Sequence, residues 1–387
     1  MKSSLALTIL RINLVIVRLF NLLLLARICQ VKEFGKISII IAIFAILSDL
    51  ATLGLSPYFQ RESVTRNYDL IGQAITTVQR NIYGYFVILI LLFVLLPHIL
   101  DITSKYIFLI GIFVLIEKLF DLIFGYLLSI RRSRMVLLTI SLSYLVNSLF
   151  IVLYLNHVNN LINYYFICRF LAALPISYAV LKFLVTKKDF GKLTYPVTNI
   201  RHFNVLNTAN TMRSADLLII GIFTNLKEVG VYSASYRLII PAIVLFNLFG
   251  PVFNYFCLGK TVHFLKFLAR RIRLFTFILF GLLIICSKYT TAIIHTVLGT
   301  NFEGIEFVFT FHLITIPFLL GNFLYANLLL MRRYEYQLSK ATVSNTLIFL
   351  SFVSLGSIFF GAIGASLGFF CANVLRFQNL SRLVSQF

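Results

Sequence analysis

Long apolar stretches recur along the whole chain, with only short polar segments between them. A helix needs about 20 consecutive apolar residues to cross the roughly 30 Å hydrocarbon layer of a membrane, and by this measure we expect about 12 membrane-spanning helices. They cover residues 4–27, 36–56, 81–98, 105–129, 135–155, 160–184, 203–224, 229–256, 272–296, 305–330, 338–359 and 361–384. The sequence therefore predicts an all-α polytopic membrane protein.

The basic residues gather in alternate connections between these spans. The formal net charge is +21, and most of the lysines and arginines fall in loops that lie on one side if the N-terminus is cytoplasmic. The bias places both termini in the cytoplasm. Nucleic-acid binding is disfavoured, because no connection is long enough to form a domain that docks a duplex.

Two connections mix basic and apolar residues and predict short amphipathic helices on the cytoplasmic surface. They are residues 57–80 and 257–273, which occupy equivalent places in the two halves of the chain. The longest cytoplasmic connection, residues 185–202, is predicted to be a linker on the membrane surface.

A repeated octapeptide divides the chain into two halves. Residues 31–38 read VKEFGKIS and residues 226–233 read LKEVGVYS. The same spacing matches Arg18 to Arg213, and both lie within apolar spans. Internal repeats of this kind are typical of transporters whose pathway lies between the halves. We expect two pseudo-symmetric six-helix bundles, residues 1–190 and 191–387, around a central cavity.

Ionisable residues inside the predicted spans are the main functional candidates. They are Arg11, Arg18, Asp49, Glu117, Lys118, Asp121, Arg169, Arg213, Asp216 and Arg237. A charge at the centre of a membrane helix costs about 2.5–3.5 kcal/mol on insertion scales, so such residues face a wet cavity or a partner. Arg18 and Arg213 fall near mid-membrane, and Arg11 lies on the same helical face as Arg18. Arginines so placed suit an anionic, phosphate-bearing substrate.

Structural pairing is the alternative for several of these residues. Asp216 could neutralise Arg213 along one helix, and Glu117 and Asp121 could pair with arginines of neighbouring spans. For Arg169 the structural role is favoured. Asp49, Glu117 and Asp121 could instead carry protons or bind a cation that drives transport.

Other chemistry finds little support in the sequence. The five cysteines form no CxxC pair and lie in or beside apolar spans, and the histidines show no metal-ligand spacing. Nucleotide-binding, hydrolase and metalloprotease motifs are absent from the sequence. We therefore expect no metal, no cofactor and no enzymatic activity.

Two segments resemble the Wzx-type flippases, which move O-antigen or capsule repeat units across the bacterial inner membrane. The first runs from Glu33-Phe-Gly35 through Asp49-Leu-Ala-Thr-Leu-Gly54 to Arg61-Glu62. The second is Arg213-Ser-Ala-Asp216 followed by Glu228-Val-Gly230-Val-Tyr232-Ser-Ala-Ser-Tyr236-Arg237. The family belongs to the MOP superfamily, together with MATE drug exporters and lipid II flippases.

This resemblance implies a function and a site. It implies 12 helices in two bundles and alternating access to a central cavity. The implied substrate is an undecaprenyl-pyrophosphate-linked oligosaccharide in a bacterial inner membrane, and the implied partners include a polysaccharide polymerase and a chain-length regulator. Carried over by position, Arg18, Arg213, Asp216 and Arg237 would line the cavity.

Two other functions stay open. A MATE-type antiporter of cationic drugs would need acidic residues to dominate its cavity. A membrane glycosyltransferase or polysaccharide polymerase would need a long outer loop, whereas the longest outer segment, residues 287–304, is short.

Overall fold

The computed structural model describes residues 2–52, 68–100, 104–129, 133–157, 159–185, 205–206, 208–257, 261–302, 304–332 and 334–386, and all regular secondary structure among them is helical. The helices are α1 (Lys2–Ile28), α2 (Val31–Thr52), α4 (Tyr68–Leu100), α5 (Ser104–Ser129), α6 (Ser133–Leu155), α7 (Leu161–Val185), η1 (Arg213–Ala215), α9 (Asp216–Phe223), α10 (Leu226–Cys257), α11 (Val262–Cys286), η2 (Ser287–Tyr289), α12 (Thr290–Leu298), α13 (Ile305–Met331) and α14 (Glu335–Ser385). Residues 208–212 are also helical and lead into η1.

Six described helical segments are long and apolar enough to cross a membrane. They are Val31–Thr52, Val136–Leu155, Leu161–Tyr178, His263–Leu298, Ile305–Met331 and Glu335–Ser385. Large apolar side chains on these helices, such as Leu138, Leu145 and Phe359, are exposed. Apolar side chains point outward in such numbers where lipid replaces water as the solvent. The predicted class, an all-α polytopic membrane protein, is confirmed.

The chain forms two compact units. Unit 1 comprises Met1–Ile28 and Ile40–Ser214, and unit 2 comprises Cys29–Ile39 and Ala215–Phe387. Helix α2 thus contributes its first turns to unit 2 and its remainder to unit 1. The predicted division between residues 190 and 191 lies outside the described residues.

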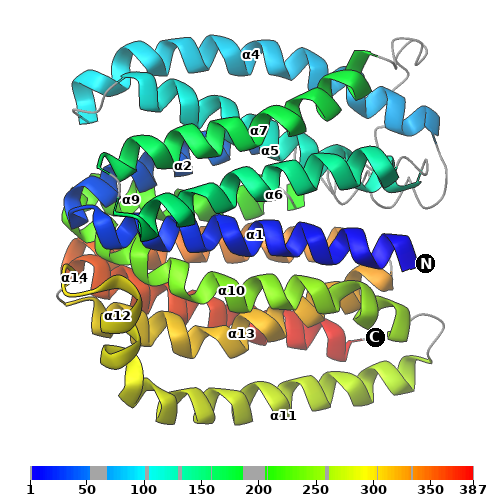
Figure 1. Ribbon diagram of the computed structural model, residues 1–387. Coiled ribbons are helices and arrows are strands. Elements are labelled where there is room, and N and C mark those ends of the chain that lie inside the picture. The colour runs from blue at the N-terminus through cyan, green and yellow to red at the C-terminus, as the bar shows by residue number, and fades with distance from the viewer. Residues whose placement is uncertain are drawn as a thin grey trace. The chain divides into compact units, whose positions relative to one another are not determined.

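Unit 1 is built around α5, α6 and α7. Helix α7 packs against α5, α6 and α1, while α6 packs against α1 and α4 packs against α5 (Figure 1). Buried rings hold the centre of this unit, with Tyr165 edge-on to both Phe150 and Phe166 at centroid distances of 5.4 and 5.3 Å. Such ring pairs add about 0.5–1.5 kcal/mol each beyond the burial of their area.

Unit 2 is built around α13. This helix packs against α10, α11, α12 and α14, and α9 packs against α10 and α14 (Figure 1). The ring of Phe318 on α13 lies 5.2 Å from that of Phe280 on α11 and 5.7 Å from that of Phe377 on α14. The amide of Asn322 donates to the backbone oxygen of Asn373 at 3.1 Å, which fixes the register of α13 against α14.

The two copies of the repeated octapeptide contact each other within unit 2. A Cβ atom on Gly35 would collide with the carbonyl oxygen of Leu226, and one on Gly230 would collide with the carbonyl oxygen of Val31. Gly35 matches Gly230 in the repeat and Val31 matches Leu226, so the contact is reciprocal. Glycine in both copies allows the two backbones to touch, as small residues do between membrane helices.

Two serines at matching positions of the repeat extend the contact between α2 and α10. Ser233 donates its hydroxyl hydrogen to Ser38 Oγ at 2.8 Å, and both residues are buried. Equivalent positions that meet each other define a local two-fold relation, with the starts of α2 and α10 running parallel. The repeat is therefore also a self-complementary helix contact.

Helix α14 is two helices joined at a sharp break. Phe360 and Gly361 have non-helical backbone angles, and Gly361 has φ +59°. The side chain of Glu228 on α10 accepts a hydrogen bond from the backbone N–H of Ala362 at 2.8 Å. A carboxylate at the start of a helix satisfies a free N–H group and opposes the helix dipole. The break separates the two predicted spans 338–359 and 361–384.

We expect Glu228→Ala to lower the free energy of unfolding by about 1–2 kcal/mol, since it removes the carboxylate that caps the second half of α14. Glu228→Gln should lose less, because the amide oxygen can still accept the hydrogen bond. Thermal unfolding of the purified protein in detergent measures both. Glu306→Ala, in the first turn of α13, is the matched control, and an equal loss in that variant would contradict this role for Glu228.

The predicted amphipathic surface helices are wrong where the structure describes them. Residues 262–273 form the first turns of α11, after an N-cap in which Thr261 Oγ1 accepts from the N–H of Phe264. Residues 68–80 likewise begin α4, and residues 57–67 lie outside the described range. Basic residues interrupt the apolar pattern there, but the helix continues through them.

Candidate functional site

A carboxylate on α5 binds arginines from two other helices of unit 1. Glu117 Oε1 lies 3.4 Å from Arg18 Nη2 on α1, and its Oε2 lies 2.9 Å from Arg169 Nη2 on α7. The side chains of Arg18 and Glu117 are 16% and 17% exposed, and that of Arg169 is 11% exposed. The guanidinium of Arg169 also lies over the ring of Phe113, 4.9 Å from its centroid. These charged groups thus meet away from the outer surface of the unit.

The next residue on α5 faces a different helix. Lys118 Nζ lies 2.7 Å from Asp49 Oδ1 on α2, and Thr211 donates to Asp49 Oδ2 at 3.3 Å. Consecutive residues of a helix point about 100° apart, so Glu117 and Lys118 serve two separate neighbours. Unit 1 therefore contains two ion-pair groups joined through adjacent residues of α5.

Polar side chains between α1 and α6 extend the ion-pair group of Glu117, Arg18 and Arg169. Arg18 Nη2 lies 3.5 Å from Ser143 Oγ, and one turn further along, Asn21 donates to the backbone oxygen of Asn147 at 2.7 Å. Both asparagines are fully buried. Neither was among the predicted site residues, although an uncharged amide inside an apolar span is itself a signal of interhelical hydrogen bonding.

In unit 2 the carboxylate of Asp216 begins α9. Its Oδ1 accepts from the N–H of Leu217 at 2.8 Å, and its Oδ2 accepts from the hydroxyl of Tyr232 at 3.0 Å. Tyr232 is fully buried and Asp216 is buried. The predicted pairing partner for Asp216 was an arginine, but a tyrosine on α10 also holds it.

Arg237 lies one helical turn beyond the repeat contact. Its Nε donates to Ser233 Oγ at 3.3 Å and its Nη2 donates to Ser38 Oγ at 3.4 Å. The guanidinium lies 5.4 Å from the ring centroid of Phe34. A buried guanidinium is thus held by hydroxyls and a ring face in these contacts, and both serines belong to the repeated octapeptide.

A buried histidine on α13 was also missed as a site residue. His312 Nδ1 lies 2.7 Å from Ser235 Oγ, and the rings of Tyr232, Tyr236 and Phe369 surround the imidazole. Its position well inside an apolar span of the sequence is the signal that could have identified His312 as a buried polar residue.

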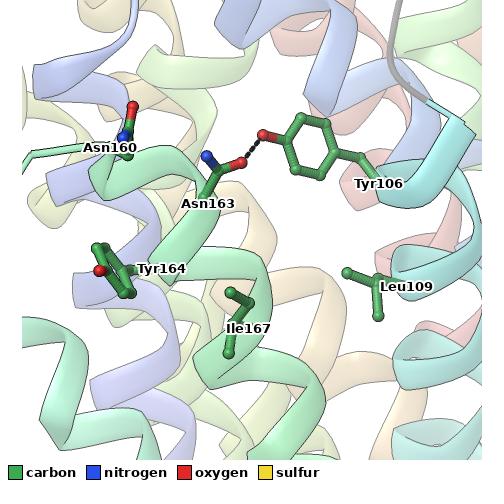
Figure 2. A pocket seen from close by; sticks show the side chains of 6 residues that line it. All are labelled: Tyr106, Leu109, Asn160, Asn163, Tyr164 and Ile167. Carbon is green, nitrogen blue, oxygen red and sulfur yellow. Dashed lines mark hydrogen bonds between the residues drawn. The ribbon is translucent and has the colours of Figure 1, made fainter.

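A small pocket lies where α5 and α7 begin, and its volume is about 270 Å³. Figure 2 shows the six lining side chains, which are Tyr106, Leu109, Asn160, Asn163, Tyr164 and Ile167. The hydroxyl of Tyr106 donates to Asn163 Oδ1. Tyrosine and asparagine side chains in a pocket can bind hydroxyl-bearing ligands. Tyrosines are also common where helices leave the membrane.

The remaining predicted site residues are placed as follows. Arg11 lies on α1, with a side chain outside the described set, while Arg213 in η1 and Asp121 on α5 are half-buried. Among the residues described, no three His, Cys, Asp or Glu side chains are grouped so that they could hold a metal ion. The assignment of these residues to a transport pathway stays a prediction.

No protein-family model and no curated protein matches this sequence. Solved structures do match it. The MATE multidrug transporter DinF-BH has a TM-score of 0.65 at 16% identity, covering 100% of this chain and 94% of its own. An inward-facing multidrug resistance MATE transporter of the MOP superfamily gives 0.63 at 12% identity, covering 96% and 95%. The lipid II flippase MurJ in an inward closed conformation gives 0.62 at 12% identity, covering 98% and 87%. The chain therefore has the fold of the MATE and MOP superfamily transporters.

Proposed function

We propose that this protein flips undecaprenyl-pyrophosphate-linked oligosaccharide repeat units from the cytoplasmic to the outer leaflet of a bacterial inner membrane. Its fold is shared with transporters and with a lipid II flippase. The charged groups of unit 1 support an anionic substrate, because the described ion pairs gather the cations Arg18, Arg169 and Lys118 inside the unit. A polysaccharide polymerase and a chain-length regulator would act on the product.

The carboxylate shared by two arginines is the observation that carries this proposal. Glu117 bonds Arg18 and Arg169 through separate oxygens, as one phosphate group can. A diphosphate headgroup that reaches Arg18 can replace Glu117 as its partner, while Arg169 keeps the carboxylate in place. Exchange of one anion for another leaves no guanidinium unpaired at any stage, which avoids the cost of a bare charge in the membrane.

The other predicted site residues would extend this route. Arg11 precedes Arg18 on α1 and would meet the headgroup first. It would then meet Arg18 and Arg213, and Asp216 and Arg237 are the other residues proposed to line the cavity. Alternating access would then release the headgroup outside, with the lipid tail remaining in the bilayer.

We expect Arg18→Ala and Arg213→Ala each to abolish surface glycan while the protein remains in the membrane. Each substitution removes a cation that holds the diphosphate. Glycan is measured on whole cells, and protein abundance is measured in isolated membranes. Arg18→Lys should restore part of the activity, because the charge survives but the bidentate geometry is lost.

Arg271→Ala on α11 is a matched control, since Arg271 is exposed and lies over the ring of Phe267. Normal glycan is expected in that variant. Normal glycan in both Arg18→Ala and Arg213→Ala would remove these residues from the pathway and with them the proposal.

A MATE-type drug antiporter is the second candidate. The solved structures include MATE transporters of similar length, and the buried Asp216 with Tyr232 could hold a proton or a cation. Asp49, Glu117 and Asp121 are the other candidates for ion coupling. Deletion of the gene separates the two functions. Lipid-linked saccharide accumulates in the inner leaflet if the protein is a flippase, whereas cells become sensitive to cationic dyes if it is an antiporter.

A further inference from the structure

We propose that helix α11 carries a binding site for an anionic phospholipid, in which Lys266, Arg270 and Arg273 hold the headgroup phosphate. The acyl chains of this lipid would lie along the apolar part of the same helix. The proposal goes beyond the flippase function, because it concerns a lipid of the surrounding membrane that stays in its own leaflet.

The three cations share one face of α11. They follow one another at spacings of four and three residues, which places side chains on the same side of a helix. Arg270 and Arg273 are exposed and Lys266 is half-buried. None of the three forms an ion pair with another described residue, and α11 contains no Asp or Glu. Their charge is therefore not neutralised within the described part of the chain.

The same face becomes apolar beyond Arg273. Phe277, Gly281 and Ile284 continue the spacing of four and three residues, and all three are exposed. A Cβ atom on Gly281 would meet no atom within 4 Å, so there is room for an acyl chain against the helix. The cationic and the apolar parts of this face are each about 10 Å long. A phospholipid presents its groups in the same order, a charged headgroup followed by an apolar chain.

Helices α13 and α14 support this face of α11. In unit 2, α11 packs against both of them (Figure 1). The ring of Phe277 lies 6.3 Å from that of Phe318 on α13 and 6.2 Å from that of Phe377 on α14. Near the cations, Tyr325 on α13 donates its hydroxyl hydrogen to the backbone oxygen of Ala269 at 3.0 Å. These contacts hold the cations at a fixed place beside neighbouring helices, as in basic sites that bind lipid headgroups.

The preference for basic residues on the cytoplasmic side accounts for the sign of these charges but not for their arrangement. That preference requires only that cations lie on one side of the membrane, on any face of a helix. Arg271 is such a cation. It points about 100° away from Arg270 around α11, and its guanidinium lies over the ring of Phe267. The shared face of the other three cations is what indicates a lipid site.

The chain contains no tryptophan, which makes a direct test possible. Phe277→Trp places a single reporter about 6 Å beyond Arg273 on the same face of the helix. Bromine atoms on a lipid acyl chain quench tryptophan emission on contact. The purified variant is placed in phosphatidylcholine nanodiscs that contain a small fraction of brominated phosphatidylglycerol or, in a parallel sample, the same fraction of brominated phosphatidylcholine.

We expect phosphatidylglycerol to bind beside the reporter about fivefold more tightly than phosphatidylcholine, roughly the effect of one lysine or arginine near an anionic headgroup. Combining Lys266→Gln, Arg270→Gln and Arg273→Gln in the reporter background should bring this ratio to about one, because no cation remains on the face. Arg271→Gln is the matched control and should keep the preference.

Phe359→Trp on α14 is a second control. Phe359 is exposed and lies in a stretch without Lys or Arg, residues 341–375, so both brominated lipids should quench it equally. Leu274→Trp, one turn after Arg270, is the reporter for use if Phe277→Trp fails to fold. Equal quenching by the two lipids at the reporter on α11 would overturn the proposal. So would an equal loss of preference in Arg271→Gln, since the attraction would then be diffuse. No transported substrate is present, so the outcome is independent of the glycan assays.

Discussion

Alanine at Gly35 or Gly230 is expected to be strongly destabilising. At both positions the added methyl would fall under 3.0 Å from a backbone oxygen of the partner helix, and a backbone cannot rotate away as a side chain can. Overpacking of this kind costs about 1–3 kcal/mol. We expect both variants to show lower thermal stability in detergent and lower abundance in membranes. The two losses should be similar, because the contact is reciprocal.

Gly84→Ala on α4 and Gly281→Ala on α11 are matched controls. A methyl group at either position would meet no atom within 4 Å. Alanine favours a helix over glycine by about 0.5–1 kcal/mol, so these variants should be as stable as the natural protein or slightly more stable. If Gly35→Ala and Gly230→Ala behave like these controls, the close backbone contact is not formed.

The positions of the spans could be predicted because they depend on length and apolar composition. The predicted span 105–129 corresponds to α5 (Ser104–Ser129), and span 305–330 corresponds to α13 (Ile305–Met331). The predicted boundary between the last two spans coincides with the break at Gly361. The surface helices could not be predicted in the same way, because α4 and α11 extend past their apolar segments and composition does not show where a helix begins.

Interactions between helices were only partly predictable. The octapeptide repeat indicated two halves, but not that its copies meet through Gly35 and Gly230. The pairing of Glu117 with arginines from neighbouring spans was one of the alternatives, and the structure confirms it. The choice of Arg18 and Arg169, and of Lys118 for Asp49, depends on how each helix is rotated. That rotation is set by packing over many residues and cannot be read from one span at a time.

The two units differ in how they hold charge. In unit 1 the pairs are ionic, with Glu117 and Asp49 each bound to a cation. In unit 2 hydroxyl groups make several of the described bonds, from Tyr232 to Asp216 and from Arg237 to two serines. A hydroxyl can donate or accept, so it tolerates a change of charge on its partner better than a fixed ion does.

Glu117→Gln tests how much the shared carboxylate contributes to stability. It leaves Arg18 and Arg169 facing a neutral amide, and loss of one partner from a buried ion pair costs about 3–5 kcal/mol. We expect a large fall in the free energy of unfolding in mixed micelles and little protein in the membrane. A variant as stable as the natural protein would show that the carboxylate does not hold the two arginines together.

Replacement of Arg18, Glu117 and Arg169 together by methionine separates the contribution of these charges to stability from their contribution to transport. Apolar side chains of similar volume often restore or exceed the stability of a buried ionic group, because no charge remains to be desolvated. The triple variant Arg18→Met, Glu117→Met and Arg169→Met should therefore be present in the membrane at near-normal levels, whereas surface glycan should be absent because the headgroup has lost Arg18. Arg169→Met alone, which leaves Arg18 paired with Glu117, is the control and should retain part of the glycan. If the triple variant is stable and still exports glycan, these charges serve the fold alone.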